Sequence, residues 1–206
     1  MRTLMLAMLA ATLLPAQARF PRHHFTVGGG GGIPDADLKP FLDTSPVVRV
    51  NYGYRFTRNF QADFGLDTVF HAANVRDFLQ SQVGDLRIKD YQFLLPFGGR
   101  VVVPWKRLEV FGGGGPTYFR YQERVRQPFG GGNFQIDCPV CRSRSGWGYY
   151  ATVGFSVALD RGQHFRLGAS SRVYRGDTSG DAFGPLPALQ TRDHWINSAA
   201  ELTLSF

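Results

Sequence analysis

The sequence has no apolar run, after its first 18 residues, that is long enough to form a membrane-spanning helix. Such a helix needs about 20 consecutive apolar residues. The 3.6-residue periodicity of amphipathic helices is also almost absent. Charged residues make up only 19% of the chain, below the roughly 25% of an average soluble domain. These shortages exclude a helical membrane protein, so a chain that enters a membrane must do so as strands.

The first 18 residues have the pattern of a cleaved signal peptide. Arg2 supplies a positive charge, residues Leu4–Leu14 are apolar, and Ala16 and Ala18 form an A-x-A cleavage site. The apolar stretch is too short to span a membrane as a helix. We therefore expect residues 1–18 to be removed during export and residues 19–206 to form one barrel domain.

The mature chain contains eight segments, each about ten residues long, in which apolar and polar residues alternate. This period of two is typical of strands with one apolar face, and about ten residues is the length that a tilted strand needs to cross a bilayer. The segments are His24–Ile33, Val47–Phe56, Phe60–Phe70, Tyr91–Val103, Leu108–Tyr121, Trp147–Leu159, Phe165–Val173 and Trp195–Phe206.

The connections between these segments alternate between long and short. The short ones are residues 57–59, 104–107 and 160–164, and the long, polar ones are residues 34–45, 72–90, 122–146 and 174–194. Outer-membrane barrels have short periplasmic turns and long external loops. The sequence therefore predicts an all-β fold, an eight-stranded antiparallel up-and-down transmembrane β-barrel. A soluble lipocalin-type barrel, with its apolar face turned inward around a ligand, is the alternative.

Three stretches carry a resemblance to a known family: Phe25-Thr26-Val27-Gly28-Gly29, the run from Trp105 to Gly114, and Glu201-Leu202-Thr203-Leu204-Ser205-Phe206. In this order and position they resemble the small outer-membrane barrels of the OmpA-like transmembrane domain, OmpX and opacity-protein type. The resemblance implies a location in the bacterial outer membrane, in contact with its lipid and lipopolysaccharide. It also implies that Leu202, Leu204 and Phe206 form the C-terminal signal read by the barrel-assembly machinery.

If the apolar faces meet lipid, the charged residues of the alternating segments point into the barrel. In so narrow an interior, charges must be paired or hydrated. We expect them to form a network that fills and stiffens the barrel; a gated, low-conductance path and substrate binding are the alternatives. The predicted lumen residues are Arg49, Arg55, Asp63, Asp67, Arg100, Glu109, Arg166, Arg172 and Glu201.

The only two cysteines, Cys138 and Cys141, lie in the third long connection. In an exported protein, this pair is expected to form a disulfide that constrains the loop. Free thiols remain an alternative. A redox-active pair would need the start of a helix, and a zinc site would need two more ligands; the neighbouring sequence supplies neither, and no cofactor is expected.

Aromatic residues near the segment ends are expected to form the two interfacial girdles of a membrane barrel. This set consists of Tyr54, Tyr91, Trp105, Tyr121, Trp147 and Trp195.

The residues favour a non-enzymatic role in envelope integrity or in surface contact through the four long loops. A narrow porin-like channel and a soluble ligand-binding barrel in the periplasm are the alternatives. A third is an enzyme that modifies lipid A, for which His71, His194 and Ser198 are the candidate residues. The net charge of +7 comes from arginines that are scattered singly, so no nucleic-acid partner is expected.

Overall fold

The computed structural model describes residues 20–35, 38–39, 42–70, 79–81, 84–126, 138–180 and 190–206; for 79–81, 84–89, 123–126 and 138–142 it describes the backbone alone. No helix in this part of the chain is long and apolar enough to cross a membrane. The strands are β1 (His23–Asp35), β2 (Ser45–Arg55), β3 (Phe60–Phe70), β4 (Leu79–Ser81), β5 (Gly84–Trp105), β6 (Leu108–Arg126), β7 (Cys138–Ala158), β8 (Phe165–Gly180) and β9 (Gln190–Ser205).

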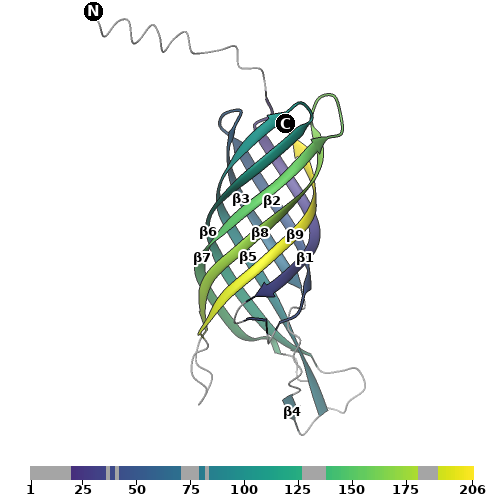
Figure 1. Ribbon diagram of the computed structural model, residues 1–206. Coiled ribbons are helices and arrows are strands. Elements are labelled where there is room, and N and C mark those ends of the chain that lie inside the picture. Colours follow the sequence, from purple (N-terminus) through teal and green to yellow (C-terminus); the bar gives the residue numbers. More distant parts are fainter. Residues whose placement is uncertain are drawn as a thin grey trace, which may run out of the picture.

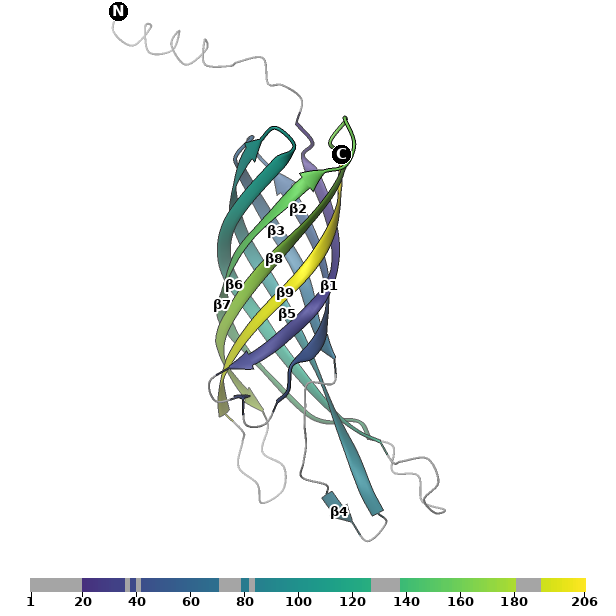
Figure 2. The ribbon, with the colours of Figure 1, turned by 45° about the vertical axis from the view of Figure 1, so that its right-hand side comes forward.

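Eight of these strands form a closed antiparallel barrel (Figures 1 and 2). Neighbours in the wall follow the chain order, β1 pairs with β9 where the two ends of the chain meet, and β3 pairs with β5. The short strand β4 pairs only with β5 and lies outside the wall. The predicted eight-stranded up-and-down barrel is therefore confirmed.

The pairing register fixes the shear of the barrel. A line drawn from Val110 through directly paired residues on β7, β8, β9, β1, β2, β3 and β5 returns to β6 at Arg120. The line has climbed ten residues, so the shear number is 10. For eight strands this corresponds to a tilt of roughly 40°, which Figure 1 shows as oblique strands. An interior of this size is just wide enough for side chains to fill.

Side chains alternate strictly between the two faces of the wall. Val48 and Val50 are exposed on the outside of β2, whereas Arg49 between them is fully buried inside. Aromatic side chains lie at both ends of the outer apolar surface, for example Trp105 (69% exposed) and Trp147 (62%). Large apolar side chains exposed on the outside, around an interior that holds buried charges such as Arg49, are the reverse of a soluble protein and fit a wall that faces lipid.

Several strands extend beyond the predicted segments at the end with the long connections. β5 begins at Gly84 rather than Tyr91, β6 ends at Arg126 rather than Tyr121, and β7 begins at Cys138 rather than Trp147. The predicted loop of residues 122–146 is thus wrong at both of its ends. Antiparallel pairing outside the bilayer needs only backbone hydrogen bonds, so these extensions lack the apolar alternation that marks a membrane segment.

The turn between β7 and β8 is held by Asp160. Its Oδ1 accepts the Phe165 backbone N–H at 2.8 Å and its Oδ2 accepts that of His164 at 3.1 Å. These bonds lower the pKa of the Asp160 carboxyl from its ordinary 3.8. A group whose pKa is lowered by folding stabilises the fold above its unfolded pKa, and this contribution disappears as the pH falls through the folded value.

Substituting this residue, Asp160→Ala, should therefore lower the urea midpoint of unfolding at neutral pH. The difference from the unmodified protein should vanish in acid below the lowered pKa. Urea titrations of the refolded barrel across this pH range measure it. A difference that did not change with pH would mean that the carboxylate charge does not hold the turn.

Candidate functional site in the barrel lumen

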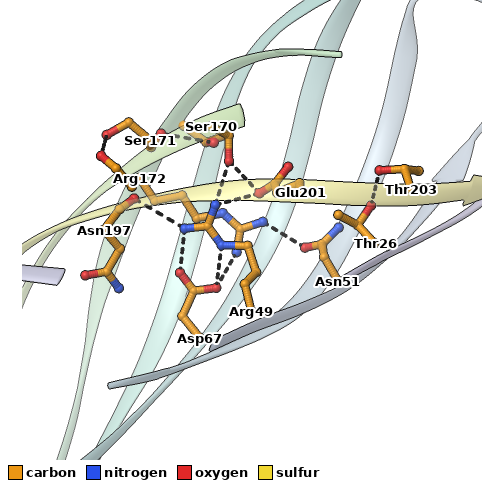
Figure 3. A network of polar contacts seen from close by, with 12 residues as sticks. Thr26, Arg49, Asn51, Asp67, Ser170, Ser171, Arg172, Asn197, Glu201 and Thr203 are labelled. Carbon is orange, nitrogen blue, oxygen red and sulfur yellow. Dashed lines mark hydrogen bonds and ion pairs between the residues drawn. The ribbon is translucent and has the colours of Figure 1, made fainter. Parts of the chain in front are cut away.

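A buried ion-pair network lies inside the barrel, where β2, β3, β8 and β9 face one another (Figure 3). Arg49 on β2 is at its centre. Its Nε and Nη2 donate to Oδ1 and Oδ2 of Asp67 at 2.9 and 2.8 Å. Its Nη1 donates to Glu201 Oε1 at 2.7 Å and to Ser170 Oγ at 2.5 Å. One guanidinium group therefore links two carboxylates that belong to different strands.

Arg172 completes this network from β8. Its Nη1 donates to Asp67 Oδ1 at 2.9 Å and its Nη2 to Asn51 Oδ1 at 3.0 Å. The Tyr174 hydroxyl donates to Asp67 Oδ2 at 2.8 Å. Asp67 thus accepts four hydrogen bonds while fully buried. Two arginines balance two carboxylates here, which is what burial of charge requires.

A second cluster lies toward the end with the short turns. Glu109 accepts two hydrogen bonds from Arg55, at 3.0 and 3.1 Å, and forms an ion pair with Arg166 at 3.4 Å. Arg100 makes a bidentate contact with Asp63, with Nη2 to Oδ1 at 2.8 Å. The cavity among these side chains has a volume of only 20 Å³, room for about one water molecule. The cluster therefore blocks this end of the lumen.

An apolar layer fills the lumen toward the long connections. Trp195 is fully buried and donates its indole N–H to the Tyr121 hydroxyl at 3.3 Å. Leu38 and Leu42, from the connection between β1 and β2, belong to the same buried cluster. The remaining members are Val47, Val69, Leu94, Phe119, Tyr150 and Tyr174. The layer therefore closes the lumen on the far side of the ion pairs.

Some buried polar atoms of the lumen have no hydrogen-bond partner among the described residues. They are both amide atoms of Gln92 and of Asn197, Thr117 Oγ1 and Arg172 Nε. Buried groups of this kind are normally satisfied by internal water. The lumen is thus polar at these positions, even though the side chains around them are tightly packed.

The structure places all nine predicted lumen residues inside the barrel, and each of them takes part in an ion pair. It divides them between the two clusters. Arg49, Asp67, Arg172 and Glu201 form the first cluster, and Arg55, Asp63, Arg100, Glu109 and Arg166 form the second.

The girdle prediction is wrong for Tyr121 and Trp195, which point inward and are buried in the apolar layer. Alternation along each strand assigns the face, and both residues are in phase with inward-facing neighbours. Sequence reasoning missed the apolar layer because it assigned every large apolar side chain to the lipid. The sequence did contain a signal for this layer: Phe119, Tyr121 and Trp195 occupy positions that strand alternation assigns to the inner face.

The two described residues considered for lipid A chemistry, His194 and Ser198, do not form a catalytic pair. Ser198 bonds to Ser171 at 3.0 Å on the outer face, whereas His194 pairs with Asp35 at 3.0 Å. His194 and Ser198 are four residues apart on one strand, about 13 Å, beyond hydrogen-bond reach. His71 lies outside the described residues.

The remaining predicted residues are only partly described. Leu202, Leu204 and Phe206 are exposed on the outer face of the last strand and its end. The backbone of Cys138 and Cys141 belongs to β7, rather than to a loop as expected. Their side chains, and so the predicted disulfide, lie outside what is described, as do Ala16 and Ala18. No group of three or more His, Cys, Asp or Glu residues suited to a metal ion occurs in the described part of the chain.

Comparison with known proteins gives the class directly. The family model described as "Outer membrane protein beta-barrel domain" matches residues 3–186, so the chain belongs to this family and is a protein of the bacterial outer membrane. No curated protein sequence matches the chain.

Solved structures of three other bacterial outer-membrane proteins share the fold. Neisserial surface protein A is 11% identical (TM-score 0.55; 89% of this chain and 97% of that chain covered). OprG from Pseudomonas aeruginosa is 12% identical (TM-score 0.56; 91% and 97% covered). Ail, the attachment invasion locus protein of Yersinia pestis, is 12% identical in its complex with a heparin analogue (TM-score 0.50; 90% and 100% covered).

Proposed function

We propose that this protein is a non-enzymatic outer-membrane barrel with a sealed lumen, which strengthens the envelope and presents its long connections for surface contact. The observation that carries the proposal is the filled interior. The Arg55–Glu109 cluster blocks one end, and the apolar layer around Trp195 closes the other. The Arg49–Asp67 network occupies the space between them. An interior filled in this way supports the wall mechanically.

The sealed lumen predicts no ion conduction. The purified protein, reconstituted in planar bilayers, should give no discrete conductance steps under conditions in which a general porin gives them. Steps that depended on salt concentration would contradict the sealed lumen. They would favour the second candidate, a narrow low-conductance channel through the polar positions at Gln92, Thr117 and Asn197.

The enzymatic alternative is tested separately from conduction. Expression of the protein should leave the mass of lipid A unchanged, because the described residues contain no catalytic pair at the outer rim. A mass shift on expression would contradict the non-enzymatic assignment.

Loss of detergent resistance in a strain that lacks the protein, and its recovery with the intact chain, would support the envelope role.

A further inference from the structure

The periplasmic end of the barrel, where the three short turns lie together with the start of β1 and the end of β9, carries a ring of positive charge (Figures 1 and 2). Two carboxylates are described at this end, those of Asp160 and of the last residue, Phe206. Both oxygens of Asp160 already accept backbone N–H groups. The basic side chains of the ring are all exposed, and none lies within 4.0 Å of a described carboxylate: Arg22, Arg58, Lys106, Arg107 and Arg161.

The opposite end of the barrel has no such excess among the side chains that the structure describes. Five basic residues there are matched by five acidic ones. They are Lys39, Arg120, Arg144, Arg175 and Arg192, and Asp35, Asp43, Asp90, Asp177 and Asp193. The ion-pair cluster at the periplasmic end of the lumen adds to the asymmetry, because it contains three arginines and two carboxylates. Among the described side chains, the excess of positive charge therefore belongs to the periplasmic end.

The ring faces a plane beneath the membrane. For eight strands with a shear number of 10, neighbouring turns lie about 11–16 Å apart around the rim and within about 5 Å of one another along the barrel axis. Trp105 pairs with Leu108 at the end of the apolar surface, and Lys106 lies between them at the tip of the turn, with a φ of 57°. An extended lysine side chain is about 6 Å long, and the headgroup layer on each side of a bilayer is also about 6 Å deep. The positive charges can therefore reach past the lipid headgroups into the periplasm.

We infer that this ring binds the peptidoglycan layer, a flat network of glycan strands whose peptides carry free carboxylates. A small anion would engage only one turn, because the turns are too far apart to share it. A network parallel to the membrane presents carboxylates to several turns at once. Each exposed ion pair is weak, but once one turn has bound, the others bind the same polymer at a high effective concentration. The inference supplies a partner for the envelope role proposed above and rests on that role, and the sealed lumen does not enter it.

Co-sedimentation of the purified barrel in detergent with isolated peptidoglycan sacculi tests the ring. The unmodified protein should sediment with the sacculi at low salt and be released at high salt, because exposed charges are screened. The variant R58Q/K106Q/R107Q/R161Q should bind about tenfold more weakly. Unchanged binding by this variant, or no binding by the unmodified protein at low salt, would overturn the inference.

A matched control separates the ring from the overall charge of the protein. The variant K39Q/R120Q/R175Q/R192Q removes the same charge from exposed residues at the outer end, and should stay within about twofold of the unmodified protein. Equal weakening in the two variants would show that only net charge matters and would overturn the ring. A boiling-dependent gel shift in both variants establishes that each of them is folded.

Two further measurements identify the anion. Sacculi whose carboxylates have been converted to amides should no longer retain the protein, and undiminished retention would overturn the assignment to carboxylates. In nanodiscs of phosphatidylglycerol, the protein should still bind sacculi as it does in nanodiscs of phosphatidylcholine. Binding that the anionic lipid abolished would assign the ring to lipid phosphates instead. A protein that failed to bind sacculi but gave no conductance in planar bilayers would overturn this inference and leave the sealed lumen in place.

Discussion

Replacing Asp67 with asparagine should lower the free energy of unfolding by about 3–5 kcal/mol, the usual cost of removing one partner from a buried ion pair. Asparagine keeps the size of the side chain but removes the negative charge that Arg49 and Arg172 share. Two buried guanidinium groups would then face only Glu201. Urea unfolding of the refolded barrel, followed by its change in gel mobility without boiling, measures the loss.

Two further variants separate charge balance from simple disruption. Asp177→Asn changes an exposed carboxylate on the outer face and should shift stability by less than about 0.5 kcal/mol. The double variant D67N/R172Q leaves one arginine against one carboxylate and should recover part of the stability lost in D67N. A double variant no more stable than D67N would mean that the lost hydrogen bonds, and not the unbalanced charge, set the cost.

Gly30→Val should prevent or strongly weaken closure of the barrel between β1 and β9. A Cβ atom at Gly30 would lie 2.7 Å from Ala199 Cα and closer still to the Ser198 carbonyl oxygen. Backbone atoms of the neighbouring strand cannot move aside as the end of a side chain can. We expect several kcal/mol of destabilisation, as for other severely overpacked sites, measured as the fraction of folded, heat-modifiable protein after refolding.

The adjacent Gly31→Val is the matched control. A Cβ atom at Gly31 meets nothing within 4 Å, and the outward position faces lipid. The substitution adds β-propensity, so it should fold at least as well as the unmodified protein. Equal behaviour of the two variants would show that the close contact at Gly30 does not limit closure.

The wall of the barrel could be predicted from the sequence, whereas the contacts inside its lumen could not. Alternation assigns each residue to a face, and export and loop lengths then indicate that the apolar face meets lipid. Charged residues such as Arg49 and Asp67 are therefore predictable lumen residues. Alternation carries no information about partners across the barrel, which depend on the shear, so the sharing of Asp67 by two arginines was not predictable.

The alternation of β9 places Trp195 on the inner face of the wall. The prediction instead placed this side chain in the membrane interface because it is large and aromatic. Near the outer rim, β9 has large apolar residues on both faces, Trp195 inward and Ile196 outward, and the alternation there is ambiguous. The long extensions of β5, β6 and β7 were missed for the opposite reason, because polar hairpins outside the bilayer show no pattern of either kind.

The meeting of β1 with β9 also governs the order of folding. Phe25 pairs with Leu204, so the contacts that complete the wall join residues from opposite ends of the sequence. Contacts with so large a sequence separation have a high loop-closure entropy, and proteins dominated by them fold slowly. Until β9 is in place, β1 has an unpaired edge whose backbone groups could pair with another chain. The glycine-rich half of β1 offers such a chain little apolar side-chain surface, which makes this exposed edge a poor template for aggregation while the rest of the wall assembles.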